Sequence, residues 1–70
     1  MASQKQRLRS DAISEMCAHL KNNVDWEEVI ALVCHEDRFD ALFAGKSDDE
    51  ANDYAHGLLR SAETLLGFNR

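Results

Sequence analysis

Two cysteines and two histidines are the residues in this sequence best suited to metal binding or nucleophilic chemistry. Cys17 and His19 lie two positions apart, and Cys34 and His35 are adjacent. On a helix these pairs diverge by about 200° and about 100°, so neither pair faces one ion. Structural zinc sites favour pairs such as C-x₂₋₄-C or H-x₃₋₅-H. The spacing therefore argues against a zinc site.

Catalysis by cysteine and histidine is disfavoured as well. Such a pair needs a cleft and a third group that orients the base, and a chain of 70 residues offers little volume for one. His56 falls on the polar side of an expected helix. The acidic run at residues 47–50 does not match the D-x-[DN]-x-[DN]-G calcium loop. We expect no enzymatic activity, no metal, no cofactor and no small-molecule substrate.

The clearest helix that would position any site runs from Ser47 to about Leu66. Ser47 and Glu50 have the spacing of a capping box, and acids in the first turn suit the positive end of the helix dipole. Gly67 fits the left-handed position after the helix, with Phe68 as its hydrophobic partner. Apolar residues recur on one face of this helix: Ala51, Tyr54, Ala55, Leu58, Leu59, Ala62, Leu65 and Leu66.

A first helix is expected before the paired asparagines Asn22-Asn23, which tolerate turn conformations. Either Ser10 caps it, or Ser3 caps a longer version together with Gln6. One face of this helix is apolar: Ala12, Ile13, Met16, Cys17 and Leu20.

The second helix is expected to begin at Asp25, with Glu28 completing a capping box. Its apolar residues fall into two groups on opposite sides of the helical wheel. The first group is Trp26, Val29, Ile30, Val33 and Cys34, and the second is Leu32, Phe39, Leu42 and Phe43. The charged residues 35–38 separate the groups. Either the helix breaks there and a short fourth helix runs to Ala44, or one helix is apolar on both sides and a second chain covers one of them.

Composition bounds the fold class. Apolar residues make up 44% of the chain, there is no proline, and there are three glycines. These values predict a single all-α domain over residues 1–70, with three helices, or four if the second is broken. A core of this size supplies only about 3–5 kcal/mol, so we expect a homodimer. The two cysteines are expected to be reduced and to act as small buried hydrophobes.

Charge is distributed unevenly along the chain, whose net charge is −5. Residues 1–9 carry Lys5, Arg7 and Arg9 and no acid, whereas all thirteen acids follow. The acidic body repels phosphate backbones, and the basic segment is expected to be a frayed, solvated arm. A regulator that contacts nucleic acid through Lys5, Arg7 and Arg9 is the alternative function. Without a secretory signal or a membrane span, the chain is expected to be cytoplasmic.

Large apolar side chains outside a single stripe are candidates for an interface. We predict a partner-binding site made of Trp26, Leu32, Phe39, Leu42 and Phe43. The competing interpretation places all of them in one monomeric core. An acidic body with such a site is typical of a small inhibitor that occupies a basic surface on a larger protein.

The length, acidity and all-helical layout of the chain resemble those of small phage-encoded proteins that switch off host regulators, including the quorum-sensing anti-activators. The resemblance lies in these general features and not in a motif, so it assigns no functional residues. It implies that the partner is a larger protein such as a transcriptional regulator.

Overall fold

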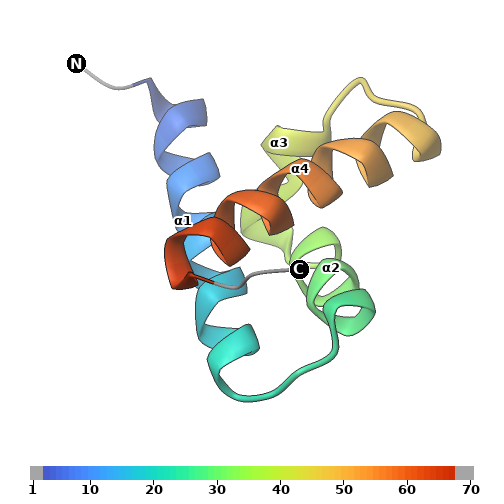
Figure 1. The fold of residues 1–70 in the computed structure, drawn as a ribbon. Helices are drawn as coiled ribbons and strands as arrows, with labels where there is room; N and C mark the ends of the chain where they lie inside the picture. The colour runs from blue at the N-terminus through green and yellow to red at the C-terminus, as the bar shows by residue number, and fades with distance from the viewer. Residues whose placement is uncertain (1–2, 68–70) are drawn as a thin grey trace.

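A computed structural model describes residues 3–67 of the protein (Figure 1). Within this range all regular secondary structure is helical and there is no β-strand, which confirms the predicted all-α class. The helices in chain order are α1 (Gln4–Lys21), α2 (Trp26–Cys34), the 3₁₀-helix η1 (Asp37–Phe39), α3 (Asp40–Phe43) and α4 (Asp48–Leu66). No helix in this range is both long enough and apolar enough to cross a lipid bilayer.

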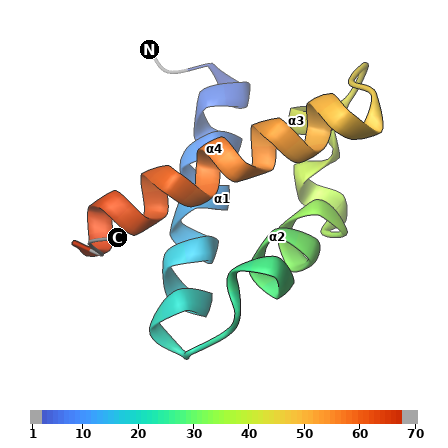
Figure 2. The same ribbon diagram turned by 45° about the vertical axis from the view of Figure 1, so that its right-hand side comes forward.

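The long helix α4 crosses α1, with which it shares the most extensive contact in the molecule. In both ribbon views α4 lies in front of α1, and α2 lies below α4 and to the right of α1 (Figures 1 and 2). One core lies between these helices and the η1–α3 segment. Its buried residues are Ala12, Ile13, Met16, Leu20, Val29, Ile30, Val33, Phe39, Leu42, Ala55, Leu58, Leu59 and Ala62.

Helix α4 begins and ends as its sequence predicts. The Ser47 hydroxyl oxygen accepts a hydrogen bond from the Glu50 backbone N–H at 3.2 Å, and the Glu50 carboxylate accepts one from the Ser47 N–H. Gly67 ends the helix with φ +74°, in the left-handed region. The predicted contact of Phe68 lies outside the described residues.

Substitution of Ser47 by alanine should destabilise the protein by about 1 kcal/mol, because the backbone N–H of Glu50 loses its acceptor. The free energy of unfolding in urea measures this effect. Ser61→Ala is a matched control in the same helix. The Ser61 hydroxyl only donates to the Gly57 carbonyl one turn earlier, a bond that adds little to helix stability. An equal loss in both variants would contradict the capping interpretation.

Helix α1 is the longer of the two versions that the sequence allowed. Ser3 and Gln6 form a full capping box, in which the Gln6 N–H donates to the Ser3 hydroxyl at 3.2 Å. The expectation of a frayed arm is therefore wrong for residues 4–9, which form the first turns of α1. The helix ends as predicted, and Asn23 adopts a left-handed φ of +63°.

The second helix is broken, as one of the two interpretations predicted. Helix α2 ends at Cys34, and Glu36 has an extended backbone before η1 and α3. Arg38 fixes the break, since its guanidinium pairs with Glu15 on α1 and with Glu36 and covers the Phe39 ring. The predicted capping box at the helix start is wrong, because the Asp25 side chain makes no capping hydrogen bond.

The break turns inward the members of the second apolar group that follow it, whereas Leu32 precedes the break and stays 42% exposed. Phe39 and Leu42 are 0% exposed and belong to the core, so their assignment to a partner-binding site is wrong. Phe43 is half-buried and packs edge-on against Tyr54, with ring centroids 5.8 Å apart. This face no longer requires a second chain to cover it, and dimerisation stays a prediction.

Candidate protein-binding surface

The residues that could do covalent or metal chemistry are dispersed in the structure. Within residues 3–67, no three histidine, cysteine or acidic side chains are grouped to hold a metal ion. Both cysteines are free thiols. Cys17 is half-buried and donates to the Ala62 carbonyl at 3.6 Å. Burial raises the pKa of the Cys34 thiol, and this disfavours the thiolate that a nucleophile needs.

Trp26 is the predicted binding residue that the structure leaves exposed beside hollows in the surface. It is the first residue of α2, is 40% exposed, and packs its ring against His56 of α4 with centroids 5.6 Å apart. Trp26 lines a shallow groove of about 280 Å³ and also a smaller one of about 180 Å³. We define the Trp26 surface as the residues that line the first groove: Trp26, Glu27, Ile30, Asn52 and His56.

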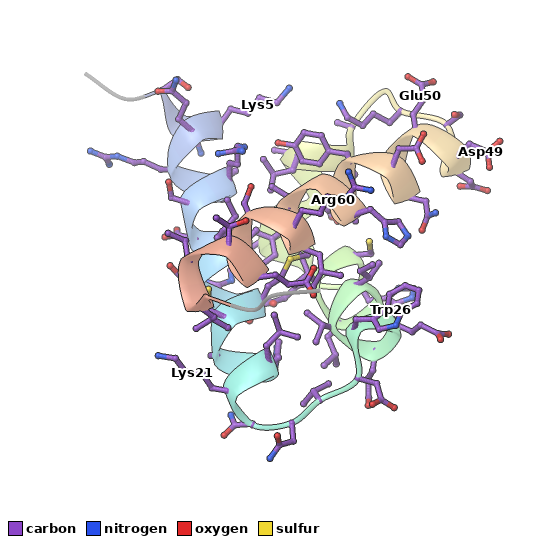
Figure 3. All side chains as sticks on the ribbon, viewed as in Figure 1. Lys5, Lys21, Trp26, Asp49, Glu50 and Arg60 are labelled. Carbon is purple, nitrogen blue, oxygen red and sulfur yellow. The ribbon has the colours of Figure 1, made fainter. Side chains whose placement is uncertain are left out.

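The fold holds this surface in place from below. Val29 and Ile30 are buried in the core and fix α2 against α4. Asn52 and His56 are one turn apart on α4, at the edge of its apolar stripe, so both reach the same side of the helix. The tryptophan therefore projects from a rigid pair of helices and not from a loop (Figure 3).

Exposed acidic residues lie beside the Trp26 surface at the start of α2, whereas Arg60 lines the smaller groove next to Trp26. The start of α2 carries Asp25, Glu27 and Glu28, and all three are exposed. Within residues 3–67 no base forms an ion pair with any of them. The first turn of α4 adds further acids, and Figure 3 shows Asp49 on the right-hand side of the view, above Trp26. A partner that approaches this side meets uncompensated carboxylates.

The five predicted binding residues do not form one patch. Leu32 is 42% exposed, but six positions along α2 place it about 120° around the helix from Trp26. Sequence reasoning also missed His56, which was expected to be merely exposed and is half-buried against the indole. The spacing of Asn52 and His56 was visible in the sequence, but their proximity to Trp26 is a tertiary contact.

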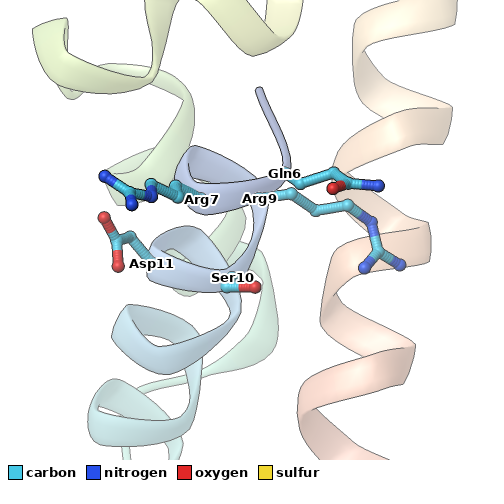
Figure 4. Close-up of a pocket in the computed structure, with 5 residues that line it drawn as sticks. All are labelled: Gln6, Arg7, Arg9, Ser10 and Asp11. Atoms are coloured by element: carbon cyan, nitrogen blue, oxygen red, sulfur yellow. The ribbon is translucent and has the colours of Figure 1, made fainter. Parts of the chain in front are cut away.

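The basic residues of the alternative function are exposed on α1 but do not form one face. Lys5 and Arg9 are one turn apart, whereas Arg7 diverges from both by about 160°. Figure 4 shows Arg7 directed to the same side as Asp11, and Arg9 directed with Gln6 toward α4. Three bases divided between two sides of one helix do not make a continuous track for a phosphate backbone.

Comparison of the chain with protein-family profiles, curated proteins and solved structures found no match. Function is therefore inferred from the geometry and charge of the surfaces described above.

Proposed function

We propose that this protein is a small binding module that docks through the Trp26 surface onto a basic surface of a larger protein and inhibits it by occupying that surface. The observation that carries the proposal is the position of Trp26. Trp26 is 40% exposed and lines two grooves, and exposed carboxylates of α2 without ion-pair partners in residues 3–67 lie next to it in the chain.

Each part of this arrangement favours protein binding. Tryptophan is among the residues most enriched at the energetic centre of interfaces. Its rigid attachment to α2 and α4 lowers the entropy lost on association. The neighbouring acids attract a basic target and repel nucleic acid. DNA-binding regulators carry such basic surfaces, so an acidic module that covers one acts as an anti-activator.

A binding comparison tests the proposal. The wild-type protein captures its partner from cells that encode it, and the purified partner is then titrated with variants. Trp26→Ala should raise Kd at least about tenfold, a loss of about 1.4 kcal/mol. Leu32→Ala is the matched control, since it truncates a similarly exposed apolar side chain of the same helix. Equal Kd values for the two variants would show that the Trp26 surface is not part of the interface.

Charge gives a second measurement that does not depend on the packing of Trp26. Glu27 and Glu28 are exposed, but they lie in the first turn of α2, where lysine opposes the helix dipole. The circular dichroism spectrum of the variant with lysine at both positions therefore has to match that of wild type before binding is compared. The association rate should fall and should depend less steeply on salt, because two of the acids beside the Trp26 surface change sign. If the partner is a DNA-binding regulator, wild-type protein should release it from its operator and the double variant should not.

A further inference from the structure

We infer that the protein has a second docking surface, a basic groove between α1 and α4 that accepts an acidic amphipathic helix from a protein partner. The groove is open to solvent and has a volume of about 420 Å³. It shares no lining residue with the larger groove beside Trp26. It shares only Arg60 with the smaller one. Its lining residues are Arg9, Ile13, Arg60, Ser61, Thr64 and Leu65.

The groove is apolar at its base and along one edge. Ile13 belongs to the core and is only 7% exposed, so it forms the floor. Leu65 is 73% exposed and is the most exposed of the large apolar side chains in residues 3–67. Exposing a leucine to this extent beside a hollow leaves apolar area that a partner can bury, at about 25 cal/mol per Å².

The rim of the groove is positive in a protein whose net charge is −5. Arg9 of α1 and Arg60 of α4 approach it from two helices, and Figure 4 shows Arg9 directed toward α4. Within residues 3–67 neither arginine forms an ion pair. Lys5 precedes Arg9 by one turn and adds charge to the same side of α1.

The two hydroxyl groups in the groove are already engaged as donors. Ser61 donates to the Gly57 carbonyl at 3.3 Å, and Thr64 donates to the Arg60 carbonyl at 2.9 Å. Polar recognition in this groove therefore falls to the two guanidinium groups. Arginine binds carboxylates through two parallel hydrogen bonds and keeps its charge at all ordinary pH values.

An acidic amphipathic helix complements both the apolar base of the groove and its positively charged rim. Leucines one turn apart on such a helix fill the space over Ile13 and beside Leu65, and glutamates on its flanks meet Arg9 and Arg60. Nucleic acid would neutralise the arginines but would leave Leu65 exposed. The α2 helix of a second copy is also acidic and apolar, so self-association is one outcome that the experiment must separate.

The test uses a synthetic helical peptide of about 15 residues, the length at which isolated helices become stable. It carries leucines at positions i and i+4 with flanking glutamates, and a matched peptide has glutamine at each glutamate. Titration is followed by amide chemical shifts of the ¹⁵N-labelled protein. We expect the shifts to change at Arg9, Ile13, Arg60 and Leu65. The glutamate peptide should bind at least about tenfold more tightly than its glutamine analogue, equivalent to about 1.4 kcal/mol.

Substitutions locate the contact. Arg9→Gln and Leu65→Ala should each weaken peptide binding severalfold. Lys21→Gln should not change it, because Lys21 carries the same kind of charge at the far end of α1 (Figure 3). Trp26→Ala should also leave peptide binding intact. Arg9→Gln should still bind a partner held through the Trp26 surface, so the two proposals fail separately.

Several results would overturn the inference. One is the absence of shifts at the groove with about 1 mM peptide, a concentration that detects even weak binding. A second is an equal loss of affinity in Lys21→Gln. Binding of a duplex oligonucleotide that Arg9→Gln abolishes and Leu65→Ala does not would assign the groove to nucleic acid. Sedimentation as a dimer that Arg9→Gln dissociates would assign it to a second copy.

Discussion

Substitution of Phe39 by alanine is expected to unfold most of the protein at room temperature. The Phe39 side chain is the largest among those that are fully buried, with 0% exposure. Removing a buried phenylalanine side chain costs about 3–5 kcal/mol, through lost burial and the cavity left behind. A single core in a chain this small supplies about the same amount. Circular dichroism at 222 nm with and without urea measures the folded fraction.

The more conservative variant Phe39→Leu keeps the experiment quantitative if alanine leaves no folded protein. It should lower the free energy of unfolding by about 1 kcal/mol. Leu32→Ala is the control, because Leu32 is 42% exposed on α2 and should change stability by no more than about 0.5 kcal/mol. A folded Phe39→Ala protein with near-normal stability would contradict the place of Phe39 in the core. It would favour the original assignment of Phe39 to the partner-binding site.

The sequence predicted best where local signals agreed. The apolar stripe of α4, its capping box at Ser47 and its left-handed Gly67 all lie within one helix, and the structure contains each of them. At the start of α1 the same reasoning left two candidates. Ser3 has Gln6 three residues later to complete a reciprocal cap, whereas Ser10 has Ile13, which has no polar group to do so.

Prediction was weakest where the chain changes direction. The partner-binding assignment of Phe39 and Leu42 came from one helical wheel drawn through residues 26–43. That wheel does not hold beyond Cys34, where α2 ends. The η1–α3 segment folds back onto α1, and Arg38 pairs with Glu15 there. No local pattern specifies such a return, because the energy comes from contacts between residues distant in sequence.

For the candidate surfaces, too, the sequence predicted local features but not contacts between distant helices. Trp26 could be chosen from the sequence because it is the only tryptophan and lies at a helix start. Its neighbour His56 comes from a helix thirty residues later in the chain, and their contact depends on how α2 docks on α4. The pairing of Arg9 with Arg60 around one groove depends in turn on the crossing of α1 and α4.

The crossing of α1 and α4 gives a second large prediction: Ala62→Leu should destabilise the protein by about 1–3 kcal/mol. Ala12 and Ala62 are both 0% exposed, and the Cys17 sulfur lies 3.6 Å from the Ala62 carbonyl oxygen. Small side chains let the two helices approach closely, and a close-packed interior has no space for an isobutyl group in place of a methyl. The urea midpoint should fall accordingly.

Ala18→Leu provides the control, because it makes the same exchange at an exposed position of α1 and should change stability by no more than about 0.5 kcal/mol. Equal effects of the two substitutions would mean that the crossing tolerates wider separation. The Ala62→Leu molecules that remain folded also allow a test of peptide binding. Arg9 and Arg60 come from the two helices that the substitution forces apart, so the acidic peptide should bind these molecules more weakly than wild type. Binding at the Trp26 surface, which α2 and α4 form, should change less.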